Sequence, residues 1–297
     1  MSNQTPLQPT LVYYPTFEQV VIAGEAWGNP EHPAVLLLHG GGQTRHSWGE
    51  TAKLLAEKGY YAVALDARGH GESSWSPDGQ YKGKMVEDLL VLLTKHFPLK
   101  PAIVGASMGG ITALVALGET TEPKASALIL VDIAPRVEQK GVERIFAFMS
   151  ANLDGFGSIE EAADAVANYL PHRPRPKTID RLANNLRKKD DGRYYWHWDP
   201  KVLESWKNTT PEEREENTKR LYAAAQKLSM PTLIVRGGMS DVVSEKVMTE
   251  FLELVPHVKS VDVTNAGHMV AGDSNHSFTN AVVDFLNQVY PPKRINQ

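Results

Sequence analysis

The stretch that most constrains this chain is residues 104–110, with the sequence VGASMGG, in which Ser107 has a glycine two residues away on either side. An apolar, strand-like run precedes it, and a helix-like segment of small residues follows it. A serine in this G-x-S-x-G spacing, between a strand and a helix, is typical of a nucleophile elbow, a tight and strained turn that lifts the hydroxyl out of the sheet. Gly105 and Gly109 suit such a turn, because the absence of a Cβ atom lets strand and helix pack closely.

Strand-like and helix-like segments alternate on both sides of this turn. The expected strands are residues 11–14, 17–27, 34–38, 60–65, 102–104, 127–131, 232–235 and 258–263. The expected helices among them are residues 47–58, 82–97, 111–117, 244–254 and 277–289. Several of the strands are continuously apolar, as in parallel sheets that are covered on both faces. The pattern therefore predicts an α/β fold with a mostly parallel, eight-stranded sheet flanked by helices, whose first two strands are antiparallel.

Residues 136–228 interrupt this alternation with helix-like segments and contain no strand of similar quality. Ser158 and Thr210, each followed three residues later by a glutamate, mark the starts of two helices. A third helix is expected around Leu182 and Leu186. We therefore expect an all-helical cap, inserted after the sixth strand and lying over the sheet edge where the elbow serine emerges. The expected division of the chain is a core of residues 1–135 and 229–297 and a cap of residues 136–228.

Composition argues against several other classes of protein. The 297 residues are 42% hydrophobic and carry a net charge of −4 with both signs interspersed, which gives no reason to expect a nucleic-acid partner. Without cysteine, the chain has no disulfide, thiolate metal site or cysteine nucleophile. No stretch approaches about 18 uninterrupted apolar residues and the first ten residues are polar, so neither a membrane span nor a signal peptide is expected. We expect a cytoplasmic protein.

Three side chains with acid, base or nucleophilic chemistry follow three separate strands of the predicted sheet. Ser107 follows the fifth strand, Asp241 the seventh and His268 the eighth. Loops after parallel strands open at the same edge of a sheet, where ligands bind, so these three residues are expected to converge. Asp132, directly after the sixth strand, reaches the same edge and is the alternative acid. The sequence context RGGMSD favours Asp241.

The order Ser, Asp, His, together with the elbow and the helical insertion, resembles the α/β-hydrolase fold superfamily, in its serine esterase-like branch with a helical cap. The resemblance implies that Ser107 attacks a carbonyl carbon and that His268 takes up and returns the proton. It also implies that Asp241, or alternatively Asp132, orients His268. The resemblance extends to the cap only in type and covers two stretches of the core, residues 30–135 and 230–290.

Cleavage of an ester places negative charge on the carbonyl oxygen, which needs hydrogen-bond donors that are fixed in advance. The resemblance implies two backbone donors, the N–H of Met108 and an N–H from the HGGG loop at residues 39–42. We expect Gly41 to supply the second donor, with Gly42 as the next candidate. His39 is expected to brace this loop, and residues 66–73 to form a structural turn beside the site.

The function that these expectations support is hydrolysis of a small carboxylic ester through an acyl-enzyme, with no cofactor and no metal. An aromatic cluster in the cap suggests an apolar pocket, whose candidate lining residues are Gly42, His197 and Trp198. Lactonase, C–C bond hydrolase and perhydrolase activities use the same three residues and stay open. A non-catalytic ligand-binding receptor on the same fold also stays open. No nucleic-acid or membrane partner is expected, and the chain is expected to be a monomer or a homodimer.

Overall fold

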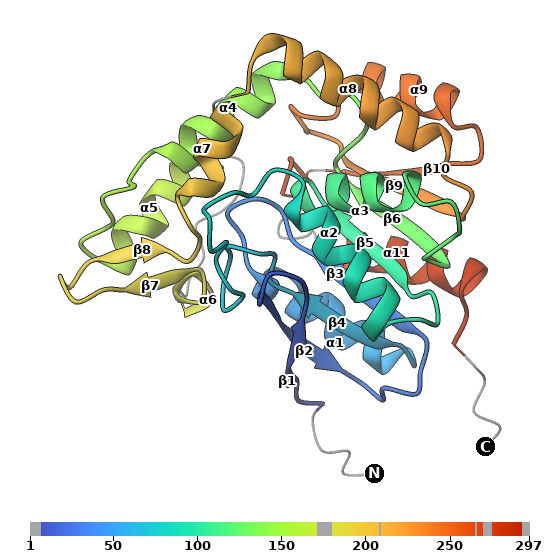
Figure 1. The fold of residues 1–297 in the computed structure, drawn as a ribbon, viewed down its shortest axis with the longest axis horizontal. Coiled ribbons are helices and arrows are strands. Elements are labelled where there is room, and N and C mark those ends of the chain that lie inside the picture. Colours follow the sequence, from blue (N-terminus) through green and yellow to red (C-terminus); the bar gives the residue numbers. More distant parts are fainter. Residues whose placement is uncertain (1–6, 171–179, 208, 265, 270–274, 293–297) are drawn as a thin grey trace.

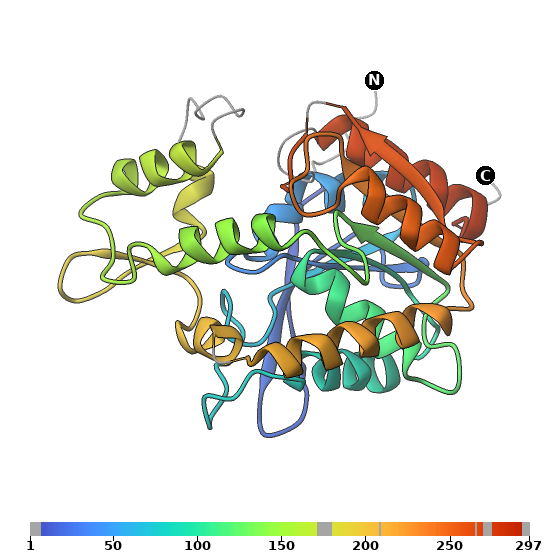
Figure 2. The ribbon, with the colours of Figure 1, turned by 90° about the horizontal axis from the view of Figure 1, so that it is seen from above.

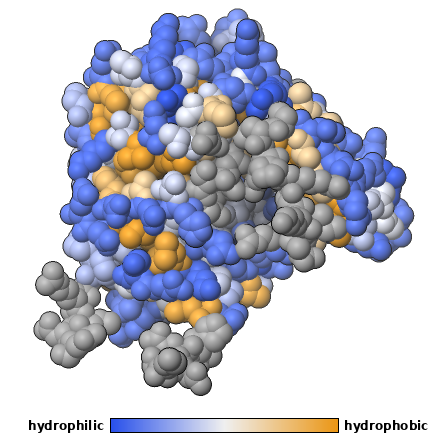
Figure 3. Space-filling model, turned by 180° about the vertical axis from the view of Figure 1, so that it is seen from behind, coloured by the Kyte–Doolittle hydropathy of each residue, from blue (hydrophilic) through white to orange (hydrophobic). Residues whose placement is uncertain are grey.

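The computed structural model describes residues 7–170, 180–207, 209–264, 266–269 and 275–292. A central sheet lies between two layers of helices, and a separate group of helices and short strands extends to one side of it (Figure 1, Figure 2). On the rear face of the molecule, hydrophilic residues surround separate hydrophobic patches (Figure 3). No helix within the described ranges is long and apolar enough to cross a membrane.

The described residues form the predicted eight-stranded sheet. Its strands are β1 (Thr10–Pro15), β2 (Val21–Trp27), β3 (Ala34–Leu38), β4 (Tyr61–Leu65), β5 (Ala102–Ala106), β6 (Ala127–Val131), β9 (Thr232–Gly237) and β10 (Lys259–Val263). They lie in the order β1-β2-β4-β3-β5-β6-β9-β10, with β1 and β2 antiparallel to their neighbours and all the others parallel. The second strand begins later than expected, because Glu18 and Gln19 have positive φ angles and form a turn.

Helices cover both faces of this sheet. The core helices are α1 (Gly49–Glu57), α2 (Lys84–Val91), α3 (Met108–Gly118), α8 (Pro211–Gln226), α9 (Glu245–Leu254) and α11 (Asn275–Val289). One apolar cluster joins the sheet to α2, α3, α8 and α9, and a second cluster joins its other face to α1 and α11. The helix expected over residues 47–58 begins only at Gly49, because residues 45–48 make a 3-10 turn. The expected helix over residues 82–97 is α2 followed by a π-helical turn.

The cap contains four helices and a hairpin in its described part, so the expectation of an all-helical cap is wrong. Its elements are α4 (Gln139–Ser150), α5 (Ile159–Tyr169), α6 (Asp180–Ala183), β7 (Leu186–Lys188), β8 (Tyr194–Trp196) and α7 (Lys201–Lys207). Leu186, expected on a helix, lies in β7 and packs with Phe156 in a small apolar cluster. Gly192, with a φ of +81°, provides the turn between the two strands. Ser158 forms the expected N-cap of helix α5, and Thr210 forms the expected capping box at the start of α8.

Helix α8 lies along α3 on the face of the sheet. A Cβ atom at Gly118 of α3 would stand 2.2 Å from the carbonyl oxygen of Ala224 in α8, so the two helices approach each other at backbone distance. Helix α8, which was expected to belong to the cap of residues 136–228, therefore packs on the core and leads into β9.

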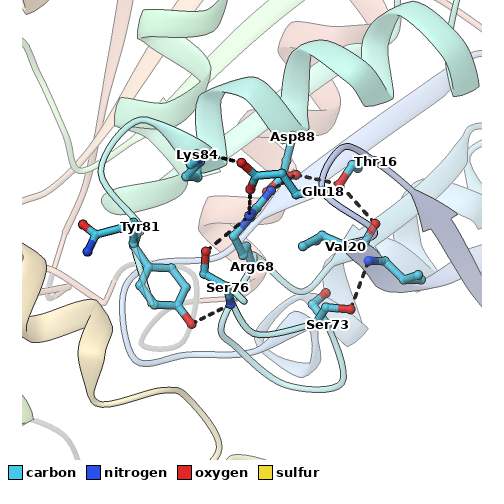
Figure 4. A network of polar contacts seen from close by, with 12 residues as sticks. Thr16, Glu18, Val20, Arg68, Ser73, Ser76, Tyr81, Lys84 and Asp88 are labelled. Atoms are coloured by element: carbon cyan, nitrogen blue, oxygen red, sulfur yellow. Dashed lines mark hydrogen bonds and ion pairs between the residues drawn. The ribbon is translucent and has the colours of Figure 1, made fainter. Parts of the chain in front are cut away.

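A buried ion pair ties the loop after β4 to two other parts of the core (Figure 4). The fully buried guanidinium of Arg68 donates two hydrogen bonds, of 2.8 and 2.9 Å, to the carboxylate of Asp88 on α2. It donates a third, of 3.0 Å, to Glu18 in the turn between β1 and β2. The hydroxyl of Thr16 donates to the same carboxylate of Asp88 at 2.6 Å. The network thus holds the β1–β2 turn, the loop after β4 and α2 together.

Candidate active site

Ser107 lies at the junction of β5 and α3, as the elbow pattern predicts. Its φ of +46° and ψ of −112° are strained for a residue with a side chain. A Cβ atom at Gly105 would lie 2.7 Å from the carbonyl oxygen of Gly109, and one at Gly109 would lie 2.6 Å from the carbonyl oxygen of Leu38. Only glycine fits at these two positions, because the obstructing atoms belong to the backbone.

The structure brings Ser107 and His268 together. The hydroxyl oxygen of Ser107 is 3.1 Å from Nε2 of His268, which follows β10. Nδ1 of the same imidazole is 2.7 Å from Oδ2 of Asp132, which follows β6 directly and is fully buried. A carboxylate only accepts, so Nδ1 carries the proton and Nε2 is left as the acceptor for the serine hydroxyl.

The carboxylate beside His268 is Asp132, which contradicts the expectation that Asp241 occupies this position. Oδ1 of Asp132 accepts the N–H of Gly237 at 2.9 Å, and Oδ2 accepts the hydroxyl of Ser240 at 2.5 Å as well as Nδ1–H of His268. Asp241 is partly exposed and forms an ion pair of 3.1 Å with Arg144 on cap helix α4.

The fold of the loop after β9 explains this exchange. The Ser240 hydroxyl accepts the N–H groups of Val242 and Val243, which makes a tight turn before α9. This turn leaves Ser240 facing the buried carboxylate of Asp132, and the carboxylate of Asp241 reaches the cap helix. The loop that was expected to supply the acid therefore supplies a hydroxyl donor to the acid of the neighbouring strand.

Two backbone N–H groups near Ser107 are open to a ligand. Met108 is the first residue of α3, so its N–H has no partner within the helix. Gly41 donates no hydrogen bond to any residue that the structure describes, whereas Gly42 donates to Nε2 of His70 at 3.3 Å. Of the two glycines considered from the sequence, Gly41 therefore has the free donor.

His39 braces the loop, as expected. Its Nδ1–H donates to the carbonyl of Gly40 at 2.7 Å, and its Nε2 accepts the N–H of Ala67 at 2.9 Å. Burial lowers the pKa of His39, although the nearby carboxylate of Asp66 acts in the opposite direction. The ring thus fastens the loop after β3 to the loop after β4.

Ser107 and His268 open into a cavity of 1410 Å³ between core and cap. Its lining is largely apolar and, on the cap side, includes Phe146, Phe148, Met149, Leu170, Trp198 and Trp206. Trp198 and Gly42 line the cavity as expected. His197 does not fit its expected pocket role, because its Nε2 lies 2.7 Å from the guanidinium of Arg187 and its carbonyl accepts the N–H of Gly71. His197 and Trp198 both follow the end of β8, and Trp198 forms an isolated bridge with His70.

Two polar residues of the site, Ser240 and His70, were missed from the sequence. Ser240 lies next to the favoured acid, and His70 lies in a turn that was expected to be structural only. The sequence signal that could have indicated them is a hydroxyl and an imidazole side chain in loops that follow strands. A partner such as Gly42, 28 residues from His70, was not visible in any local pattern.

The comparisons with known proteins agree with this fold. The model of the alpha/beta hydrolase fold family matches residues 33–274, most of the chain. The chain belongs to the α/β-hydrolase fold family. This α/β hydrolase is 29% identical over 260 residues to esterase Rv0045c of Mycobacterium tuberculosis, covering 85% of this chain and 82% of the relative.

A solved structure of that mycobacterial esterase superimposes on this α/β hydrolase with a TM-score of 0.75 and 27% identity, covering 96% of this chain and 93% of the other. A second relative is the 3-hydroxybutyrate-oligomer hydrolase of Cupriavidus necator, which is 27% identical over 258 residues. That match covers 83% of this chain and 86% of the relative. The family and the esterase-like branch expected from the sequence are thus confirmed.

Proposed function

We propose that this α/β hydrolase cleaves carboxylic esters through a covalent acyl intermediate on Ser107. The observation that carries the proposal is the line of contacts from Ser107 to His268 to Asp132 at the floor of an apolar cavity. Relatives named as an esterase and as a hydrolase of hydroxybutyrate oligomers support the same reaction class.

In the acylation step, the hydroxyl oxygen of Ser107 attacks the ester carbonyl carbon, and Nε2 of His268 takes the hydroxyl proton. The imidazolium that forms is stabilised by Asp132 on its other nitrogen. The N–H groups of Gly41 and Met108 donate to the oxyanion of the tetrahedral intermediate. His268 then gives its proton to the leaving alcohol. Water, activated by the same imidazole, hydrolyses the acyl-serine and releases the acid.

The largely apolar lining of the cavity favours uncharged esters with an apolar acyl or alcohol part. Met149 and Trp206 from the cap and Met108 from the elbow surround the position where a Cβ atom of Gly41 would lie, at 3.8 to 3.9 Å. Thioether side chains are flexible and polarisable, so they adapt to ligands of different shape. A charged group of a substrate placed against these three side chains would lose hydration there.

The proposal is tested with p-nitrophenyl acetate and a fluorophosphonate probe. We expect a burst of p-nitrophenol equal to the enzyme concentration, and covalent labelling at Ser107. Ser107→Ala should show neither, because no other hydroxyl contacts His268 among the described residues. Hydrolysis that persists in Ser107→Ala would contradict the proposal. Slow turnover with tight retention of product would instead support a ligand-binding receptor.

A further inference from the structure

The imidazole of His70 lies fully buried against the loop that carries Gly41. Its Nδ1–H donates to the carbonyl of Arg68 at 3.2 Å, which leaves the lone pair of Nε2 to accept the N–H of Gly42 at 3.3 Å. Burial first, and then the neighbouring ring of His39, lower the pKa of His70 to about 3. The ring is therefore neutral near neutral pH, and its Nε2 remains an acceptor.

The glycine loop presents three consecutive N–H groups, and two of them are occupied from within the protein. The N–H of Gly40 donates to the side-chain oxygen of Gln43 at 3.1 Å, and the N–H of Gly42 donates to His70. Gly42 has a φ of +75°, so the chain turns sharply directly after this third N–H group. Gly41 is left as the member of the loop whose N–H has no partner among the described residues.

We infer that His70 is a positioning residue for ester hydrolysis, because it holds the N–H of Gly42 away from the substrate and so fixes the N–H of Gly41 as the oxyanion donor. The inference rests on the proposed function, since only an acyl-transfer reaction requires that donor. The side chain of His70, in the loop after β4, thus determines whether Gly41 or Gly42 stabilises the transition state.

The cap holds His70 in place from its other side. The N–H of Asp199 donates to the carbonyl of Gly69, and the N–H of Gly71 donates to the carbonyl of His197, both at 2.7 Å. The turn that carries His70 is thereby joined to the cap by one hydrogen bond on each side. These bonds prevent the imidazole from withdrawing from Gly42.

Variants of His70 separate this role from a merely structural one. His70→Ala removes the acceptor, and His70→Gln supplies an amide oxygen in its place. With p-nitrophenyl acetate we expect His70→Ala to lower kcat about 100-fold while KM changes by less than about 3-fold, because a displaced oxyanion donor affects the transition state rather than substrate binding. His70→Gln should recover part of kcat. The affinity for a boronic acid, which mimics the tetrahedral intermediate, should fall in parallel with kcat.

Thr279→Ala is the matched control, because Thr279 is buried, hydrogen-bonded to Thr51 and located on α11. It should lower the thermal midpoint without changing kcat. Unchanged kcat in folded His70→Ala, with normal fluorophosphonate labelling of Ser107, would overturn the inference and leave the proposed function intact. Absence of labelling in the wild type would overturn both.

A measurement on the wild type covers the case in which neither His70 variant folds. The ¹⁵N shifts of the His70 ring report which nitrogen carries the proton. We expect Nδ1 to be protonated and Nε2 to be unprotonated throughout the range from about pH 5 to pH 8. A proton on Nε2 in this range would overturn the inference, because that nitrogen would no longer accept the N–H of Gly42.

Discussion

Asp132→Asn should lower kcat/KM for a p-nitrophenyl ester by about 10⁴-fold, the cost that loss of the orienting carboxylate has in triads of this kind. The substituted side chain would present an amide NH₂ or a neutral oxygen to His268, so that the imidazole either adopts the wrong tautomer or loses the charge that stabilises its protonated form. The carboxylate also accepts hydrogen bonds from Gly237 and Ser240, which fix its plane and aim it at Nδ1. Single-turnover acylation, monitored through the release of p-nitrophenol, measures the effect directly.

Asp241→Asn is the matched control, since the same substitution is made in the carboxylate that the sequence context favours. This side chain forms a partly exposed ion pair with Arg144, and such pairs contribute little, so kcat/KM should change by less than about 3-fold. A larger loss in Asp241→Asn than in Asp132→Asn would return the orienting role to Asp241. Circular dichroism of both variants checks that the fold is retained.

The two aspartates show where prediction from the sequence stops. Both directly follow or closely follow parallel strands of one sheet, so topology alone places both at the edge where Ser107 emerges. The difference arises from backbone conformation: Asp132 has a φ of +48°, and Ser240 turns the loop after β9. The Ser240 turn is formed by residues two and three positions away, but the contact that decides the acid joins Ser240 to Asp132, 108 positions earlier, and no local pattern indicates it.

The strands of the sheet, by contrast, were predictable because their sequence signal is local. Five-residue apolar runs such as β3 and β6 are long enough to be distinguished from loops, and turns or helices with clear ends separate them. Strands β7 and β8 have three residues each, which is too short for an alternating pattern to be recognised. Tyr194 also pairs with Phe156, 38 positions earlier in the sequence, so tertiary contacts overrode the helix-like spacing of Leu182 and Leu186.

The second large effect is expected on stability rather than on activity. Asp88→Ala should lower the free energy of unfolding by about 3–5 kcal/mol, because it leaves the buried guanidinium of Arg68 without its main partner. Thr16 loses its 2.6 Å hydrogen bond to this carboxylate in the same variant and keeps its 3.3 Å bond to the carbonyl of Val20 (Figure 4). Glu18, the remaining carboxylate on Arg68, is partly exposed and accepts one hydrogen bond from it, so it cannot replace the two bonds that Asp88 accepts.

Urea denaturation followed by circular dichroism measures this loss, with Glu18→Gln as the control at the exposed end of the network. Glu18→Gln should be far less damaging, because solvent screens that carboxylate and Asp88 still neutralises Arg68. Replacing both buried partners, in Arg68→Met with Asp88→Leu, should restore much of the stability that Asp88→Ala loses, since no charge then stays buried without a partner. Equal losses in Asp88→Ala and Glu18→Gln would show instead that Arg68 reaches solvent, and that the pair does not hold α2 against the loop after β4.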